Sequence, residues 1–119
     1  MAALFKSAHT IGILAAAAIT QGRAITAAGA VSTAAGNAVG IAETDAASGA
    51  RVPVTALGTA LATAGAAITA GAAVEVGTAG KLITRSAGIT VGRALTAAAA
   101  DGDQIEVLLI PNRSEEHTS

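Results

Sequence analysis

The side chains able to act in catalysis or to bind a metal ion are few in this sequence and widely spaced. Outside the last seven residues there are one histidine, His9, no cysteine, and six carboxylates between Glu43 and Glu106. General acid–base catalysis requires a titratable group within reach of the reacting atoms, and His9 lies far from every carboxylate in the sequence. We therefore predict that the chain is not an enzyme, with no catalytic residue and no cofactor.

The sequence Asp101-Gly102-Asp103 resembles the first residues of a calcium-binding loop. Such a loop needs further oxygen ligands at fixed later positions, and here an apolar run follows instead. Asp and Gly together are typical of tight turns, so we interpret this segment as a polar turn before a strand. Glu43-Thr44-Asp45 is interpreted as a solvated loop, and no metal site is predicted.

The charge and hydropathy patterns argue against a nucleic-acid or membrane partner. The net charge is −1 and the seven basic residues are scattered singly, whereas binding to phosphates needs clustered Lys and Arg. The longest uncharged stretch, Val52–Val74, is long enough to cross a bilayer. It consists mainly of Ala, Gly and Thr, and a membrane helix needs denser Leu, Ile, Phe and Val.

The composition also predicts a thin core. Apolar residues make up 52% of the chain but aromatic residues only 1%, and most of the apolar share is alanine. Each buried alanine removes little surface from water, so a lone monomer should be marginally stable. Small, weakly cored domains commonly gain stability by self-association or by docking on a larger surface.

The elements that carry these residues form an internal near-repeat. Its two copies are marked by four pairs of glycines: Gly22 and Gly71, Gly29 and Gly80, Gly40 and Gly92, Gly49 and Gly102. The spacing within the pairs grows from 49 to 53 residues, which indicates short insertions in turns. Two copies are too few for a solenoid, so we predict one pseudo-symmetric β domain.

Short alternating apolar patterns predict strands within each copy. The predicted strands are 51–57, 74–76, 81–84, 89–95 and 104–110. The alanine runs at 15–18 and 97–100 favour helix by propensity, but each leaves room for about one helical turn. Pro53 cannot donate a backbone hydrogen bond, so we expect it at a sheet edge or a bulge. The fold is predicted to be mainly β, with short helical turns at most.

The last seven residues, Arg113–Ser119, differ from the rest of the chain in being wholly polar. They read as the translation of a common short-read sequencing adapter. We therefore interpret residues 113–119 as an artefact and exclude them from fold and function. An ordinary disordered tail is the alternative.

The repeated pattern resembles the head decoration (capsid cement) proteins of tailed bacteriophages. The resemblance rests on three segments: Val39-Gly40-Ile41-Ala42 followed by Ser48–Val54, the similar Val91-Gly92-Arg93-Ala94 followed by Asp101–Leu109, and a middle hairpin within Gly65–Val76. It covers about residues 11–111. The unusual richness in alanine departs from the family pattern.

The resemblance implies a small β-barrel or β-sandwich that binds the outside of an assembled phage head and stabilises its lattice. The partners would be the major capsid protein lattice and further copies of the chain, with a trimer favoured. The protein would reside on the capsid exterior, and in the host cytoplasm during assembly. A prokaryotic surface-layer, filament or adhesin subunit is the alternative function.

The same resemblance suggests a division of the chain. Residues 1–10 are expected to be a flexible arm, and residues 11–112 a single decoration domain. Phe5, Lys6 and His9 are the candidate contacts of this arm with the capsid, since an aromatic anchor beside a charge suits a segment that orders on binding. A frayed chain end is the alternative.

Overall fold

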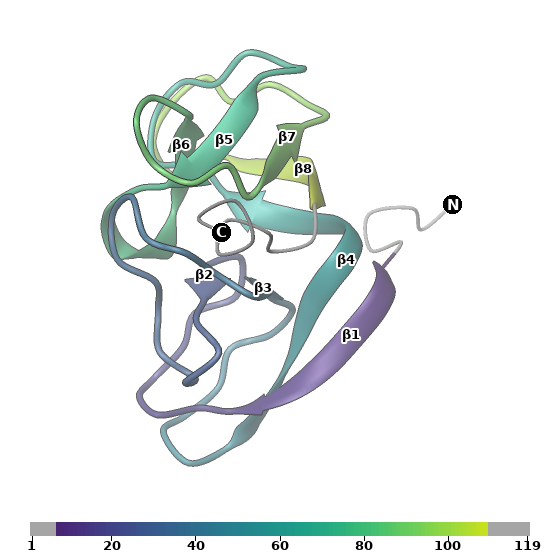
Figure 1. Cartoon of the computed structure of the whole chain (residues 1–119), viewed down its shortest axis with the longest axis vertical. Coiled ribbons are helices and arrows are strands. Elements are labelled where there is room, and N and C mark those ends of the chain that lie inside the picture. Colours follow the sequence, from purple (N-terminus) through teal and green to yellow (C-terminus); the bar gives the residue numbers. More distant parts are fainter. Residues whose placement is uncertain (1–6, 110–119) are drawn as a thin grey trace, which may run out of the picture.

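The part of the chain that the structure describes folds into one antiparallel sheet of eight strands (Figure 1). The computed structural model describes residues 7–109, with side chains from residue 10 onward. The strands are β1 (Ser7–Leu14), β2 (Ala24–Ile25), β3 (Gly40–Ala42), β4 (Arg51–Thr63), β5 (Ala73–Val76), β6 (Leu82–Thr84), β7 (Gly92–Ala94) and β8 (Gln104–Leu109). Within the described residues, the only helical element is a 3-10 turn, η2 (Thr78–Gly80).

The sheet curls into a barrel-like form. Its strands follow the order β2-β3-β4-β8-β7-β5-β6, and β1 also pairs with β4. Beyond the end of β4, Ala64 bridges to Leu82 of β6, and the Gly65 N–H donates to the Leu82 carbonyl at 2.7 Å. The far end of the sheet therefore returns to β4. The predicted fold class, mainly β and barrel-like, is confirmed.

The internal repeat is confirmed by the strand pairing. In the first copy Ile13 pairs with Val52, and Ala24 with Ile41. In the second copy the same pairs are formed by Ala62 with Ile105 and by Ala73 with Arg93. Ala62 and Ala73 lie 49 positions after Ile13 and Ala24, and Ile105 and Arg93 lie 53 and 52 positions after Val52 and Ile41. We call residues 10–55 the first repeat and residues 59–108 the second repeat.

Strand β4 belongs to both repeats. Its first half pairs with β1 and β3, and its second half pairs with β8. In the second repeat the second half of β4 takes the place that β1 has in the first, and β8 takes the place of the first half of β4. Figure 1 shows β4 running from the lower part of the molecule, with β1 to β3, to the upper part with β5 to β8.

The loops repeat as closely as the strands. The Ala15 N–H donates to the Ala50 carbonyl at 2.8 Å in the first repeat, and the Ala64 N–H donates to the Asp103 carbonyl at 2.7 Å in the second. Isolated bridges join Ile19 to Ala46 and, equivalently, Ile68 to Ala98. These bridges replace the helical turns that alanine propensity allowed at 15–18 and 97–100, where the chain makes bends.

The apolar core is divided into two clusters, one beneath each repeat. The cluster of the first repeat is centred on Ile25, Val52 and Val54. The cluster of the second repeat is larger, and it also takes in Ala24 and Ile41 from the first repeat. This overlap packs the two repeats together. Eight of the 21 buried apolar residues are alanine, in keeping with the thin core expected from composition.

Two expectations about local structure need revision. Residues 7–10, assigned to the N-terminal arm, form the first half of β1, so the expected arm boundary falls inside a strand. Pro53 lies within the central strand β4 and not at a sheet edge. Its carbonyl accepts from the Glu43 N–H at 2.9 Å, one residue beyond the end of β3. The side of β4 on which Pro53 lacks an N–H donor is therefore the side on which β3 has already ended.

Candidate interaction surface

The three predicted contact residues lie at or beyond the start of the described structure. Phe5 and Lys6 lie outside the described residues. The backbone of His9 is in β1, paired with Leu57 of β4, and its side chain lies outside the described part. Their assignment as capsid contacts therefore stays a prediction.

Two carboxylates accept hydrogen bonds from backbone N–H groups of loops. Asp103 Oδ2 accepts from the N–H groups of Ala99 and Ala100, at 2.7 and 3.1 Å, which is a local cap of the kind that Asp makes in turns and agrees with the interpretation of 101–103 as a polar turn. Asp45 Oδ1 accepts from the Gln21 N–H at 2.7 Å and so joins two loops that are distant in the sequence.

Glu75 anchors the loop between β6 and β7. Its Oε1 atom accepts from the N–H groups of Ser86 and Gly88, at 2.7 and 2.8 Å. Those two hydrogen bonds lower the pKa of the Glu75 carboxyl below its ordinary value, and the nearby Arg85 charge lowers it further. A hollow of about 360 Å³ lies beside it, bordered by Lys81 and Asp101, which form an ion pair at 2.9 Å.

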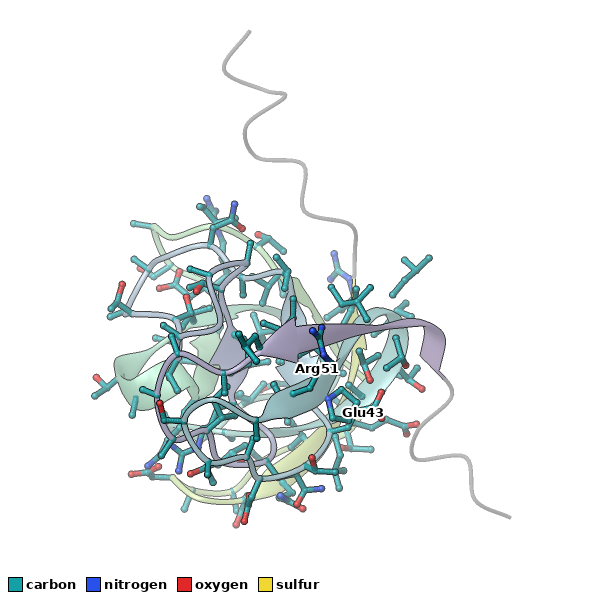
Figure 2. The ribbon with its side chains drawn as sticks, turned by 90° about the horizontal axis from the view of Figure 1, so that it is seen from below. Glu43 and Arg51 are labelled. Carbon is teal, nitrogen blue, oxygen red and sulfur yellow. The ribbon has the colours of Figure 1, made fainter. Side chains whose placement is uncertain are left out.

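Glu43 is not the solvated loop residue that the sequence suggested. It is half-buried, and its Oε2 atom accepts from the hydroxyls of Thr55 at 2.5 Å and Thr10 at 2.9 Å. Arg51 also lies beside β1, and its Nη1 atom donates to the Gly12 carbonyl at 3.3 Å (Figure 2). Thr55 is completely buried, so Glu43 satisfies a hydroxyl that has no access to water.

The described residues offer no assembled centre for metal chemistry. No three His, Cys, Asp or Glu residues among them are close enough together to hold a metal ion. Nor does the described part contain a helix of the length and apolar character needed to cross a membrane.

The second repeat exposes leucines on the outer face of its sheet. Leu108 is 43% exposed and Leu95 is 44% exposed. Leu108 of β8 pairs with Arg93 of β7, and Leu95 lies two residues after Arg93, so the leucines are diagonal neighbours on one face. Leu61 of β4, half-buried, faces the same side opposite Glu106. We call Leu61, Leu95 and Leu108 the leucine face.

The first repeat has no leucine at the positions equivalent to this face, and Gly12 takes the place of Leu61. Thr55 is equivalent to Leu108, with the same place in the pairing of the central strand, and Glu43 is equivalent to Leu95. Sequence reasoning did not find the leucine face, although the glycine spacing of 52 to 53 residues aligns Glu43 with Leu95 and Thr55 with Leu108. Reading the two copies position by position, and not only for what they share, would have found it.

Comparison with known proteins adds two findings. A family model described as phage cement protein matches residues 5–109. Among solved structures, the head fiber gp8.5 N base of bacteriophage phi29 has a similar fold, with a TM-score of 0.65 and 16% sequence identity over 87% of this chain and 95% of that chain. None of the curated proteins compared with the chain matches it.

Proposed function

The chain belongs to the phage cement protein family and is thus a structural protein of phage heads, and from this premise we propose that it binds the outer surface of the assembled head and stabilises the mature lattice. The observation that supports the proposal most strongly is the family match over residues 5–109, which includes every strand of the sheet. It favours a head protein over the surface-layer or adhesin subunit that the sequence left open.

The physical mechanism is a binding equilibrium. A subunit that binds the mature lattice and not its dissociated parts stabilises the lattice in proportion to its occupancy. Weak contacts add up when copies bind as an associated oligomer, because the binding of one copy holds the others near their own sites. The protein acts in this proposal as a surface ligand with no catalytic step and no nucleic-acid or membrane partner.

We further propose that copies of the chain associate, with a trimer as the favoured form. Several core positions are filled by alanine, for example Ala60 and Ala62 in the middle of β4. So thin a core gains from burying more surface between copies. Analytical ultracentrifugation of the purified chain tests this part, and a monomer at all concentrations would contradict it.

The main proposal is tested by co-sedimentation of the purified chain with expanded heads of its own phage that lack it. Binding that saturates at a fixed number of copies per head is expected, together with heads that resist heating better when decorated. Unexpanded precursor heads are the control. Failure to bind expanded heads would contradict the proposal.

A further inference from the structure

We propose that the leucine face of the second repeat, Leu61, Leu95 and Leu108, is the surface that docks on the head lattice. This inference rests on the proposed function and names the part of the chain that performs it. The partner is an apolar patch on the outer surface of the shell protein. The observations that carry the inference come from the comparison of the two repeats.

The fold itself does not require leucine at these positions. The first repeat forms the same backbone with Glu43 and Thr55 in the equivalent places. There Thr55 is completely buried and Glu43 half-buried, and the hydroxyls of Thr55 and Thr10 donate to the Glu43 carboxylate. In the second repeat Thr59, the equivalent of Thr10, is present, but the two residues that would complete the polar cluster are leucines.

The leucines are exposed in the single chain. Leu95 and Leu108 are each more than two-fifths exposed, and half-buried Leu61 is the diagonal neighbour of Leu108 across β4 and β8. Scattered exposed leucines are common on protein surfaces, whereas neighbouring ones mark contact sites. Glu106 lies between Leu61 and Leu95, and Arg93 lies opposite Leu108, so charged groups accompany the leucines on this face.

The size of the patch favours a lattice over a second copy of the chain as the main occupant. A stable interface between two free proteins buries about 800 Å² per partner, and three partly exposed leucines supply only a fraction of that apolar area. A contact of this size is useful where many copies bind one shell. Membership in the cement family supports such a shell as the partner.

The decisive variant is the double substitution Leu95→Glu and Leu108→Thr. It copies the residues of the first repeat into the second, where Thr59 already stands in place of Thr10, so the variant is designed to keep its fold. The matched control is Leu14→Thr, because Leu14, 57% exposed, is the most exposed leucine of those whose side chains the structure describes and lies at the end of β1, away from the face. Its equivalent in the second repeat is Thr63.

The experiment measures the affinity of each form for expanded heads by co-sedimentation. The double variant should bind at least tenfold more weakly than the wild type, and Leu14→Thr within twofold of it. If the double variant does not fold, as judged by circular dichroism, the single variants Leu95→Lys and Leu108→Lys replace it and should also lose at least tenfold.

The outcomes separate the inference from the function on which it rests. If the wild-type chain does not bind expanded heads, the proposed function and the inference are both overturned. Wild-type binding with unchanged binding of the folded double variant would overturn the leucine face alone. If the double variant changes from an oligomer to a monomer in the absence of heads, and this monomer keeps the wild-type affinity for heads, the leucine face contacts a second copy of the chain. That result would overturn the proposed partner.

Discussion

The two repeats share one backbone but differ in how they treat the same outer positions. The first repeat buries Thr55 completely and satisfies its hydroxyl with Glu43. The second repeat places Leu108 and Leu95 there and leaves both exposed. The pairing of the strands is the same, so the difference lies in what packs around them. Ile41, the partner of Thr55, is buried in the core cluster of the second repeat, whereas its equivalent Arg93 is exposed. The positions of Leu95 and Leu108 are therefore open to a partner, and that of Thr55 is not.

What the repeats hold in common identifies the requirements of the fold. Gly40 and Gly92 are equivalent, and at both a Cβ atom would overlap a carbonyl oxygen of the neighbouring strand, that of Thr55 or of Leu108. The two strands approach too closely for any side chain at these points. Substitutions can distinguish such shared features, which the fold requires, from unshared ones such as Glu43 and Leu95.

The largest effect is expected at the shared glycines. Gly40→Ala and Gly92→Ala should each lower the free energy of unfolding by about 3 kcal/mol, because the added methyl group forces the strands apart. A Cβ atom added at Gly92 would lie 2.5 Å from the Leu108 carbonyl oxygen. The loss should be greater at Gly40, because a Cβ atom added there would lie still closer to the Thr55 carbonyl oxygen. Urea unfolding measures both.

Gly49→Ala and Gly102→Ala are the controls for this pair. An added Cβ at either glycine has nothing within 4 Å, although both have positive φ angles of 88° and 96°. We expect each control to cost about 1 kcal/mol from backbone strain alone. Equal losses at all four glycines would show that strand approach is not the constraint shared by the repeats.

A medium effect is expected from the polar cluster of the first repeat. Glu43→Leu should cost about 1–3 kcal/mol, because it leaves the buried Thr55 hydroxyl without its acceptor. Thr55→Val removes that hydroxyl, so the double variant Glu43→Leu with Thr55→Val should be more stable than the sum of the two losses predicts. A double-mutant cycle by thermal unfolding measures this coupling; strictly additive losses would contradict the contact.

A smaller effect, confined to acid, is expected at Glu75. Its pKa is lowered in the folded state, so its contribution is complete above the unfolded value of about 4.3 and is lost as the pH falls through the folded pKa. The equivalent residue in the first repeat is Thr26, whose hydroxyl accepts from the Ala30 N–H at 3.2 Å and does not titrate in this range.

Hydrogen exchange at pH 7 and pH 3 tests this difference. The amides of Ser86 and Gly88 should lose protection in acid, after correction for intrinsic rates, while the Ala30 amide keeps its own. Glu75→Gln should remove the pH dependence in the second repeat. Equal loss of protection in both repeats would indicate that another group controls the acid response.

The smallest effect is expected at the ion pair between Lys81 and Asp101. The Asp101 side chain is 61% exposed, and exposed pairs contribute about 0–1 kcal/mol. Asp101→Ser, which copies the equivalent Ser48 of the first repeat, should lower stability by less than about 1 kcal/mol, and salt should abolish the difference. A larger, salt-independent loss would mean that Asp101 also supports the adjacent turn.

The sequence was most informative where local patterns carry the signal. The alternation in 104–110 and 74–76 predicted β8 and β5, and the glycine spacing predicted the duplication. β1 was missed because Ile11 and Ile13 alternate over only a few residues, and this strand is defined by its long-range pairing with β4. Local propensity carries no information about such a partner.

The candidate surface was less predictable than the fold. A glutamate next to Thr44 and Asp45 has the sequence of an exposed loop, and only the pairing of β3 with β4 brings Glu43 to Thr55. The leucine face has the same origin, since Leu95 and Leu108 become neighbours through the register of β7 with β8. Register is set by the whole sheet, which a window of sequence does not contain.

Because β4 is shared, the two halves of the molecule cannot open independently. Releasing the first half of β4 from β1 and β3 would leave its second half, paired with β8, attached to a loose end. Local unfolding in either half should therefore spread to the other, and the whole sheet should open as a single cooperative unit. Under the proposed function, such a subunit would leave the shell as one unit and not half by half.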